Sequence, residues 1–415
     1  MKRRQGWKVL AVVVLVVVAS LVGLWIAHTR NVSEPPGRSP APAGAVVDRL
    51  QLGATLTQQT PLTETLPAAL LDKSVGIVGV SLSGNGTDDP EPSPGVFDWS
   101  SLDSRMRQLQ SVHASIMMRV FEAPPWMTGG VPKGAVRPRF YHAFAELVLD
   151  SAERYPMIHY FAIWNELMGY RSDPSHWNYV AYTRLYNVVY STLKGFNPSL
   201  NVGGPYAPFP PASVHAREST IVGPWGALDQ NSLDTVTYWL AHKAGADFIA
   251  VDGRTAFPSA VPSDPVGATT MFAAVDSWIE HQTTLPIWWT EWYARSPKLG
   301  SAEWNALSAY ALIQLAYSGA SSALIWDSEF EPGRSTATPG LWTAGTQSGT
   351  ALTPVFNVLR GEMIGTEVRL WSPVAGVEEL SNPGHFVAID LTGQGRRISV
   401  LGRTVELPPY GIVTG

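Results

Sequence analysis

Two glutamates, each placed at the end of a short apolar run, are the residues of this chain best suited to chemistry. One lies in Trp164-Asn165-Glu166 after the run 160–164, and the other lies in Thr290-Glu291-Trp292 after the run 286–289. Short apolar runs are typical of buried strands, and in a barrel of parallel strands the catalytic residues lie at the carboxyl ends. Two carboxylates that meet in one cleft can supply the proton donor and the nucleophile or base that cleavage of a glycosidic bond requires. A single glutamate after a strand is usually a solvated loop residue, but two in similar contexts favour the catalytic interpretation.

Polar residues near the predicted strand ends are further candidates. Asn165 directly precedes Glu166, so its amide can hydrogen-bond a sugar hydroxyl beside the reaction centre, and such a contact can strengthen in the transition state. The alternative for Asn165 is a bond to the loop backbone. Glu122 and Glu329 also follow strand-like runs. We rank both below the glutamate pair, as rival carboxylates or as sugar ligands.

Aromatic residues near predicted strand ends can bind the apolar face of a sugar ring. Trp126, Trp292 and Trp326 lie at such positions. The chain has 16 tryptophans, so most of them must belong to the core, and core packing is the alternative for each of these three. Tyr206 can reach the same cleft from another strand, with a buried structural role as its alternative.

The elements that must position these residues alternate between strand-like and helix-like segments. Eight strand-like runs occupy residues 50–56, 75–82, 115–121, 158–164, 201–206, 248–252, 286–290 and 323–326. Apolar side chains recur at helical spacing in four of the segments between them, residues 102–110, 140–154, 179–193 and 303–317. Strands alternating with helices over about 300 residues predict an α/β fold, the (β/α)8 TIM barrel. Glu166 then follows the fourth strand and Glu291 the seventh.

Changes in composition divide the chain into four predicted parts. They are a cytoplasmic basic stub with a membrane anchor or signal peptide at 1–30, a Pro-rich linker at 31–46, a catalytic barrel at 47–359, and a small C-terminal antiparallel β module at 360–415. The last part is predicted from short strand-like runs at 367–370, 386–391, 397–401 and 404–407, separated by Gly and Pro.

The first 30 residues have the pattern of a membrane signal. Lys2, Arg3, Arg4 and Lys8 precede residues 9–27, nineteen residues without a charge, which is about the length needed to cross the hydrocarbon core. Basic residues before such a span predict a cytoplasmic N-terminus. A cleaved signal peptide is the alternative, but its apolar region is shorter, about 7–15 residues. We favour the uncleaved anchor, and both alternatives place the rest of the chain outside the cytoplasm.

Composition argues against several classes of protein. Hydrophobic residues make up 45% of the chain and charged residues 15%, which suits a large buried core and not a disordered chain. Five of the 29 basic residues and none of the acidic ones lie in 1–30, so the remainder has 24 basic against 34 acidic residues, a net charge of −10. We therefore expect no nucleic-acid partner. Cysteine is absent and the nine histidines show no ligand spacing, so we expect neither a metal nor another cofactor.

The ordered set of motifs resembles clan A of the glycoside hydrolases, and within it family 39 and its relatives. The resemblance covers about residues 50–330 and rests, besides the two glutamate motifs, on Gly95-Val96-Phe97-Asp98-Trp99, Ala123-Pro124-Pro125-Trp126 and Val202-Gly203-Gly204-Pro205. It implies a retaining enzyme in which Glu166 is the acid/base and Glu291 the nucleophile. Those roles require a raised pKa for Glu166 and an ionised Glu291. The resemblance also implies that Trp326, on the eighth strand, forms the floor of the first sugar subsite.

Two positions depart from the pattern of the clan. Its members often have an arginine on the second strand beside the nucleophile, and residues 75–82 contain none. Arg119, on the third strand, can take that place if it points into the mouth of the barrel. The sixth strand of the clan often ends in histidine or tyrosine, whereas this chain has Val251-Asp252-Gly253-Arg254. These departures leave the identity of the sugar open.

The sequence thus predicts a retaining glycoside hydrolase whose substrate is an oligosaccharide or polysaccharide. The N-terminal anchor favours a polysaccharide of the cell envelope or the extracellular space, since residues 9–27 would hold the catalytic domain to the membrane. A non-catalytic carbohydrate-binding protein on a degenerate barrel is the first alternative. A barrel hydrolase that uses a metal is the second, and the lack of histidine and aspartate clusters weighs against it. The sequence does not indicate an oligomeric state.

Overall fold

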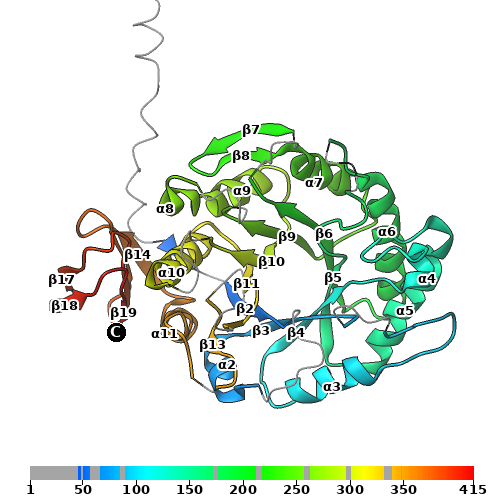
Figure 1. Cartoon of the computed structure of the whole chain (residues 1–415), viewed down its shortest axis with the longest axis horizontal. Helices are drawn as coiled ribbons and strands as arrows, with labels where there is room; N and C mark the ends of the chain where they lie inside the picture. The colour runs from blue at the N-terminus through cyan, green and yellow to red at the C-terminus, as the bar shows by residue number, and fades with distance from the viewer. Residues whose placement is uncertain are drawn as a thin grey trace, which may run out of the picture. The chain divides into compact units, whose positions relative to one another are not determined.

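Eight parallel strands form the closed barrel that the alternating apolar runs predict (Figure 1). In chain order, which is also their order around the barrel, they are β2 (Gln51–Thr55), β3 (Ile77–Ser81), β4 (Ser115–Val120), β5 (Ile158–Ile163), β6 (Asn201–Phe209), β9 (Phe248–Arg254), β10 (Ile287–Tyr293) and β11 (Ser322–Ile325). Each of them overlaps one of the eight predicted runs. The TIM-barrel prediction is therefore confirmed, with Glu166 after the fourth barrel strand and Glu291 on the seventh.

The fold is known from a computed structural model of the chain. It describes residues 45–47, 50–56, 66–84, 89–171, 173, 175–211, 217–256, 262–295, 301–330, 339–346 and 348–415. Within these ranges no helix combines the length and the apolar character needed to span a bilayer. The predicted anchor at 9–27 and most of the predicted linker at 31–46 lie outside the described residues.

The barrel strands are buried on both faces, which explains why they read as apolar runs rather than alternating ones. The inward faces of seven strands meet in one cluster inside the barrel, formed by Ile77, Met117, Ala162, Tyr206, Phe248, Ala250, Trp288 and Leu324. The outward faces pack against the surrounding helices in a second, larger cluster. The interior of the barrel is therefore a packed core below the mouth.

Helices follow the strands and cover the outside of the barrel, as Figure 1 shows. They are α2 (Ala68–Ser74), α3 (Ser100–Leu109), α4 (Pro125–Thr128), η1 (Pro138–Phe140), α5 (Tyr141–Arg154), α6 (Tyr179–Phe196), α7 (Gln230–His242), α8 (Pro265–Ala268), α9 (Met271–Glu280), α10 (Ala302–Tyr317), α11 (Thr353–Val358) and η2 (Leu359–Met363). Three of the longer ones, α3, α5 and α6, bury one apolar face, as predicted.

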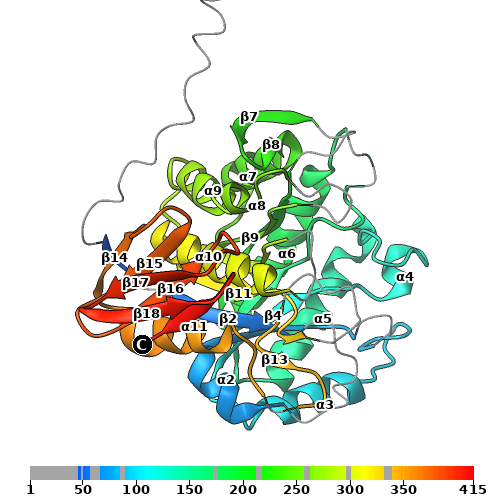
Figure 2. The same ribbon diagram turned by 60° about the vertical axis from the view of Figure 1, so that its left-hand side comes forward.

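Helix α10 is different because it is buried almost all round. It packs on the barrel with one side and contacts β16 and β19 of the C-terminal sheet with the other. Figure 2 shows the helix between these two layers. A helix that is apolar on all sides needs such a double cover, so the C-terminal sheet completes the burial of α10.

The C-terminal segment, together with the strand β1 from before the barrel, forms an antiparallel sheet in the order β1-β14-β15-β16-β19, and it also forms a separate hairpin. The sheet strands are β1 (Ala45–Val46), β14 (Glu367–Trp371), β15 (Val377–Ser381), β16 (Phe386–Asp390) and β19 (Ile412–Thr414), and the hairpin strands are β17 (Arg396–Val400) and β18 (Arg403–Leu407). The sequence did not indicate β15, because its central residues Glu378 and Glu379 look solvent-exposed and are in fact buried. Two short pairs complete the described part, β7 (Glu218–Gly223) with β8 (Gly226–Asp229), and β12 (Glu329–Phe330) with β13 (Trp342–Thr343).

Candidate active site

A polar pocket of about 220 Å³ opens at the carboxyl ends of the barrel strands and contains both predicted glutamates. Its walls come from segments that are far apart in the sequence, and they are formed by Ser81, Ser83, Gly84, Arg119, Phe121, Glu122, Lys133, Asn165, Glu166, Met168, Arg254, Glu291, Tyr293 and Trp326. A concave site with convergent polar groups at this end of a TIM barrel is where a ligand is expected.

The backbone that carries Glu166 is a tight turn with unusual geometry. Trp164, Glu166 and Leu167 have φ angles of 80°, 45° and 49°, in a region that residues other than glycine seldom adopt. The Trp164 ring fixes this turn from below, because it is fully buried and its Nε1 donates to the carbonyl oxygen of Met168 at 2.8 Å. Such backbone angles are concentrated at functional sites, and here they direct the Glu166 carboxylate into the pocket.

Glu291 reaches the pocket because β10 contains a bulge. Trp289 pairs with Val251 and Glu291 with Asp252, so Thr290 is an extra residue on β10 relative to β9. Side chains alternate between the two faces of a strand, and an inserted residue reverses the facing of everything after it. Without the bulge, Glu291 would point outward towards the helices. With it, Glu291 points into the barrel mouth and Trp292 points outward.

Arg119 connects the two halves of the site. Its Nη1 donates to Asn165 Oδ1 at 3.1 Å and to Glu291 Oε2 at 3.4 Å. Its Nε and Nη2 both donate to Ser81 Oγ, at 2.9 and 2.6 Å. The guanidinium therefore stands beside Glu291, as expected if Arg119 points into the mouth of the barrel, and Ser81 on the second barrel strand accepts hydrogen bonds from it.

Glu166 has its own arginine partners. Arg171 Nη2 donates to Glu166 Oε2 at 3.0 Å, and Arg254 Nη1 donates to Glu166 Oε1 at 3.4 Å. The same Arg254 nitrogen donates to Tyr293 Oη at 2.8 Å. Both oxygens of Glu166 are thus engaged by guanidinium groups, one from the loop after β5 and one from β9.

The carboxyl groups of the site have perturbed acidities. Burial raises the pKa of Glu291 to about 7, Arg119 opposes the rise, and repulsion from Glu166 adds to it. Burial also raises the pKa of Asp252 well above its usual value, with repulsion from Glu166 and Glu291 acting in the same direction. The implied roles require an ionised Glu291, and Arg119 is the group that favours this form. Burial opposes it, because Glu291 is enclosed by the barrel mouth and only 6% exposed.

Several of the predicted ligands lie in the pocket. Asn165, Arg119, Glu122 and Trp326 all contribute to its walls. Glu122 also pairs with Lys133, whose Nζ lies 3.9 Å from Glu122 Oε1. The ring of Trp326 lies 5.1 Å from that of Tyr293, measured between centroids, and the two form a partly exposed aromatic surface at the mouth.

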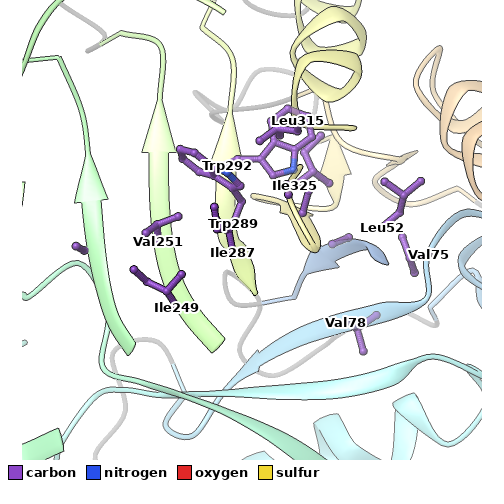
Figure 3. Close-up of a cluster of buried hydrophobic side chains, with 14 of the residues drawn as sticks. Leu52, Val75, Val78, Ile249, Val251, Ile287, Trp289, Trp292, Leu315 and Ile325 are labelled. Atoms are coloured by element: carbon purple, nitrogen blue, oxygen red, sulfur yellow. The ribbon is translucent and has the colours of Figure 1, made fainter. Parts of the chain in front are cut away.

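Three predicted ligands do not reach the pocket. Trp292 is fully buried because the bulge turns it outward, and Figure 3 shows it in the core with Trp289, Ile325 and Leu315. Tyr206 is fully buried inside the barrel below the site. For both, the prediction of sugar contact was wrong, since a side chain without exposed surface cannot touch a ligand.

The third of these residues is Trp126. It is only partly buried, but it packs edge-on against Phe140 and its Nε1 donates to the carbonyl oxygen of Glu91 at 3.0 Å. It is therefore held on the short helix α4 after β4, outside the walls of the pocket. The sequence placed Trp126 directly after a strand and did not indicate this helix, which directs the side chain away from the pocket.

Sequence reasoning missed Arg254, Tyr293, Arg171 and Ser81. A signal was available for the first two. Arg254 lies two residues after Asp252 and Tyr293 two after Glu291, and residues two apart on a strand share a face. For Arg171, in an irregular loop, the sequence holds no comparable signal. Within the described ranges, no three or more histidine or carboxylate side chains are grouped so as to hold a metal ion.

Comparison with known proteins gives a likeness of fold. No protein-family model and no curated protein matches the chain. Among solved structures, SrfJ from Salmonella typhimurium has a TM-score of 0.62 at 12% identity, covering 92% of this chain and 94% of that one. A family 39 glycoside hydrolase from Bacteroides cellulosilyticus WH2 has a TM-score of 0.59 at 14% identity, covering 89% and 79%. A glucosidase from Croceicoccus marinus has a TM-score of 0.56 at 16% identity, covering 90% and 82%.

At identities of 12–16%, these likenesses show the fold alone. A family 39 glycoside hydrolase is among the structures that share it, so the resemblance of the motifs to family 39 and its relatives is confirmed at the level of the fold.

Proposed function

We propose that this chain is a retaining glycoside hydrolase that acts on a polysaccharide outside the cytoplasm. The observation that carries the proposal is the meeting of Glu166 and Glu291 in one pocket at the carboxyl end of a TIM barrel, each with an arginine partner. The names of similar structures, a glucosidase and a family 39 glycoside hydrolase, support the reaction class.

In the first step a carboxylate oxygen of Glu291 attacks the anomeric carbon while Glu166 gives its proton to the glycosidic oxygen. The bond from that oxygen to the anomeric carbon breaks, the leaving sugar departs as an alcohol, and a glycosyl ester of Glu291 remains. In the second step Glu166 takes a proton from water, whose oxygen displaces Glu291 from the anomeric carbon. The anomeric configuration is therefore retained.

The polar neighbours have definite parts in this scheme. Arg119 stabilises the negative charge of the Glu291 carboxylate before the attack. It stabilises the same charge again in the second step, when Glu291 is released from the glycosyl ester. Because Asn165 Oδ1 accepts from Arg119, the Asn165 NH₂ group is the part of the amide left to donate to a sugar hydroxyl. Trp326 and Tyr293 offer an aromatic surface to the sugar ring.

Two variants test the roles. Glu166→Gln should lower turnover of a polysaccharide by about 10²–10⁴-fold, the usual contribution of a general acid. It should leave the first step with activated aryl glycosides largely intact, because those leaving groups need no proton. Glu291→Ala should abolish turnover of every substrate. Glu153→Gln, on the exposed face of α5, is the control. A Glu291→Ala protein as active as the parent would overturn the assignment.

A non-catalytic carbohydrate-binding protein is the second candidate, and one observation favours it. Arg171 and Arg254 engage both oxygens of Glu166, and at least one of these contacts must open before Glu166 can protonate a leaving group. In a binding protein that performs no proton transfer, the contacts of Arg171 and Arg254 with Glu166 would persist when the glycan is bound. Binding of glycans from a broad panel without release of reducing ends would support this candidate.

The location is proposed from the N-terminal sequence. If residues 9–27 are an uncleaved anchor, the full-length protein should remain with the membrane fraction after washing at high salt and high pH. Added protease should then reach the barrel while the cytoplasmic membrane is still intact. Recovery in the medium, with a new N-terminus near residue 30, would indicate a cleaved signal peptide instead.

A further inference from the structure

Asp252 is a buried carboxyl group directly beside Glu291, and no role has so far been given to it. The two residues are paired in register on the adjacent strands β9 and β10. Asp252 is 1% exposed, so its carboxyl group has no access to bulk water. A buried polar group without hydrogen bonds is costly, and the surroundings of its two oxygens are therefore informative.

Among the described residues, no N–H or O–H group donates to either oxygen of Asp252. The side chain with which it makes hydrogen-bonding contact is Glu291, another carboxyl group. Two ionised carboxylates cannot hydrogen-bond each other, because both are acceptors only. The contact is favourable only if one of the two groups carries a proton.

The surrounding charges decide which group holds that proton. Glu291 has Arg119 within 3.4 Å, a cation that stabilises its ionised form. Asp252 faces Glu166 from the end of β5, Tyr206 from β6, Glu291 and Tyr293 from β10, and Arg254 from its own strand. Arg254 is the only cation in that list, and it is also engaged by Glu166 and Tyr293. A second negative charge beside Glu291 would be repelled by both glutamates.

We propose that Asp252 is a neutral carboxylic acid that donates a hydrogen bond to the carboxylate of Glu291, and so positions this nucleophile and stabilises its ionised form. The proposal deepens the proposed function and rests on it for the role of Glu291. Asp252, near the end of the sixth barrel strand, would then be a carboxylic acid kept neutral by its buried surroundings, so that it can donate a hydrogen bond. Asp252 is a positioning residue, since it acts on the substrate only through Glu291.

An infrared measurement tests the proton without requiring turnover. At about pH 8.5, above the pKa of about 7 of Glu291, the parent should still show the carbonyl band of a protonated carboxylic acid. The band should be missing in Asp252→Asn. It should persist in Asp276→Asn, a control at a second buried carboxyl group, which accepts from Trp289 Nε1 far from the pocket. Identical spectra for the parent and Asp252→Asn would overturn the proposal.

If Asp252→Asn does not fold, a substitution of Glu291, its partner in the contact, provides a second test. In Glu291→Gln the amide can donate to Asp252, so Asp252 no longer needs a proton and the same band should disappear. Persistence of the band in Glu291→Gln would contradict the proposal.

The pH profile of kcat/KM separates positioning from a merely structural role. Asp252→Asn and Asp252→Leu are close to the parent in shape, but only asparagine can donate to Glu291. We expect the acidic limb to stay near that of the parent in Asp252→Asn and to move up by about one pH unit in Asp252→Leu. An acidic limb that moves down in Asp252→Asn would mean that Asp252 is normally ionised, and an unmoved limb in Asp252→Leu would mean that it does not act on Glu291. If the parent cleaves no glycoside at all, the proposed function fails, whereas the infrared result still decides where the proton resides.

Discussion

Replacing Arg119 by glutamine should shift the pH dependence of catalysis, because Arg119 is the cation in contact with Glu291. A neighbouring cation lowers the pKa of a carboxyl group by about 1–3 units. The 3.4 Å separation between Nη1 and Oε2 is long for a charge-assisted hydrogen bond, so we use the lower end, about one unit. With a pKa of about 7, half of Glu291 is ionised at pH 7. One unit higher, about one tenth is ionised, and kcat/KM at pH 7 should fall about fivefold from this cause alone.

The assay is the pH profile of kcat/KM with an activated aryl glycoside. The acidic limb of Arg119→Gln should lie about one unit above that of the parent, so that this part of the defect disappears at alkaline pH. A further loss that does not depend on pH is expected, since Asn165 Oδ1 also loses its donor. Arg119→Lys, which keeps the charge, should leave the limb closer to that of the parent, and Arg184→Gln on the exposed side of α6 is the control. An acidic limb for Arg119→Gln that coincides with that of the parent would refute this account of Glu291.

The same pKa shift has a consequence for stability. Glu291 has a folded-state pKa of about 7 against an ordinary value of 4.5, so the folded protein binds more protons than the unfolded chain between these two values. The free energy of unfolding should therefore fall as the pH rises through this window. In Arg119→Gln the fall should continue to higher pH, which thermal unfolding measured across the pH range would detect.

Three other predictions concern the walls of the pocket, the core and metal dependence. Trp326→Ala should raise KM about tenfold, which corresponds to a loss of about 1.4 kcal/mol of aromatic contact with the sugar. Trp126→Ala should leave KM unchanged, because Trp126 lies outside the pocket. Equal effects of the two substitutions would contradict this placement. Trp292→Ala should lower the free energy of unfolding by about 3–5 kcal/mol, as for other large buried side chains, and a variant with the stability of the parent but a raised KM would return Trp292 to the sugar site. A strong chelator should leave kcat/KM unchanged, and a loss restored by a divalent cation would favour the metal-dependent alternative.

The sequence by itself determined the barrel and the pair of glutamates. Strands of a parallel barrel are covered on both faces, so each one reads as an unbroken apolar run that can be found without knowing its neighbours. The order of strands around the barrel then follows the order in the chain. For this reason the positions of Glu166 and Glu291, after the fourth strand and on the seventh, could be stated before any coordinates.

The tertiary structure decided which side chains face the substrate. Simple alternation from Trp288, which points into the barrel, would place Trp292 in the mouth and Glu291 outside, and only the extra residue Thr290, visible in the pairing of β10 with β9, reverses this. The backbone angles around Glu166 depend in the same way on the buried ring of Trp164. No repeating pattern of residues marks a bulge or a tight turn in the sequence, because each is stabilised by packing against residues that are distant in the chain.

The charges of the site were likewise decided by the fold. Arg119 comes from β4, and Arg254 and Asp252 come from β9, and each contacts a partner between 39 and 172 positions away in the sequence. A carboxyl group is ordinary or perturbed according to its burial and its neighbours, and both quantities exist only once the barrel has closed.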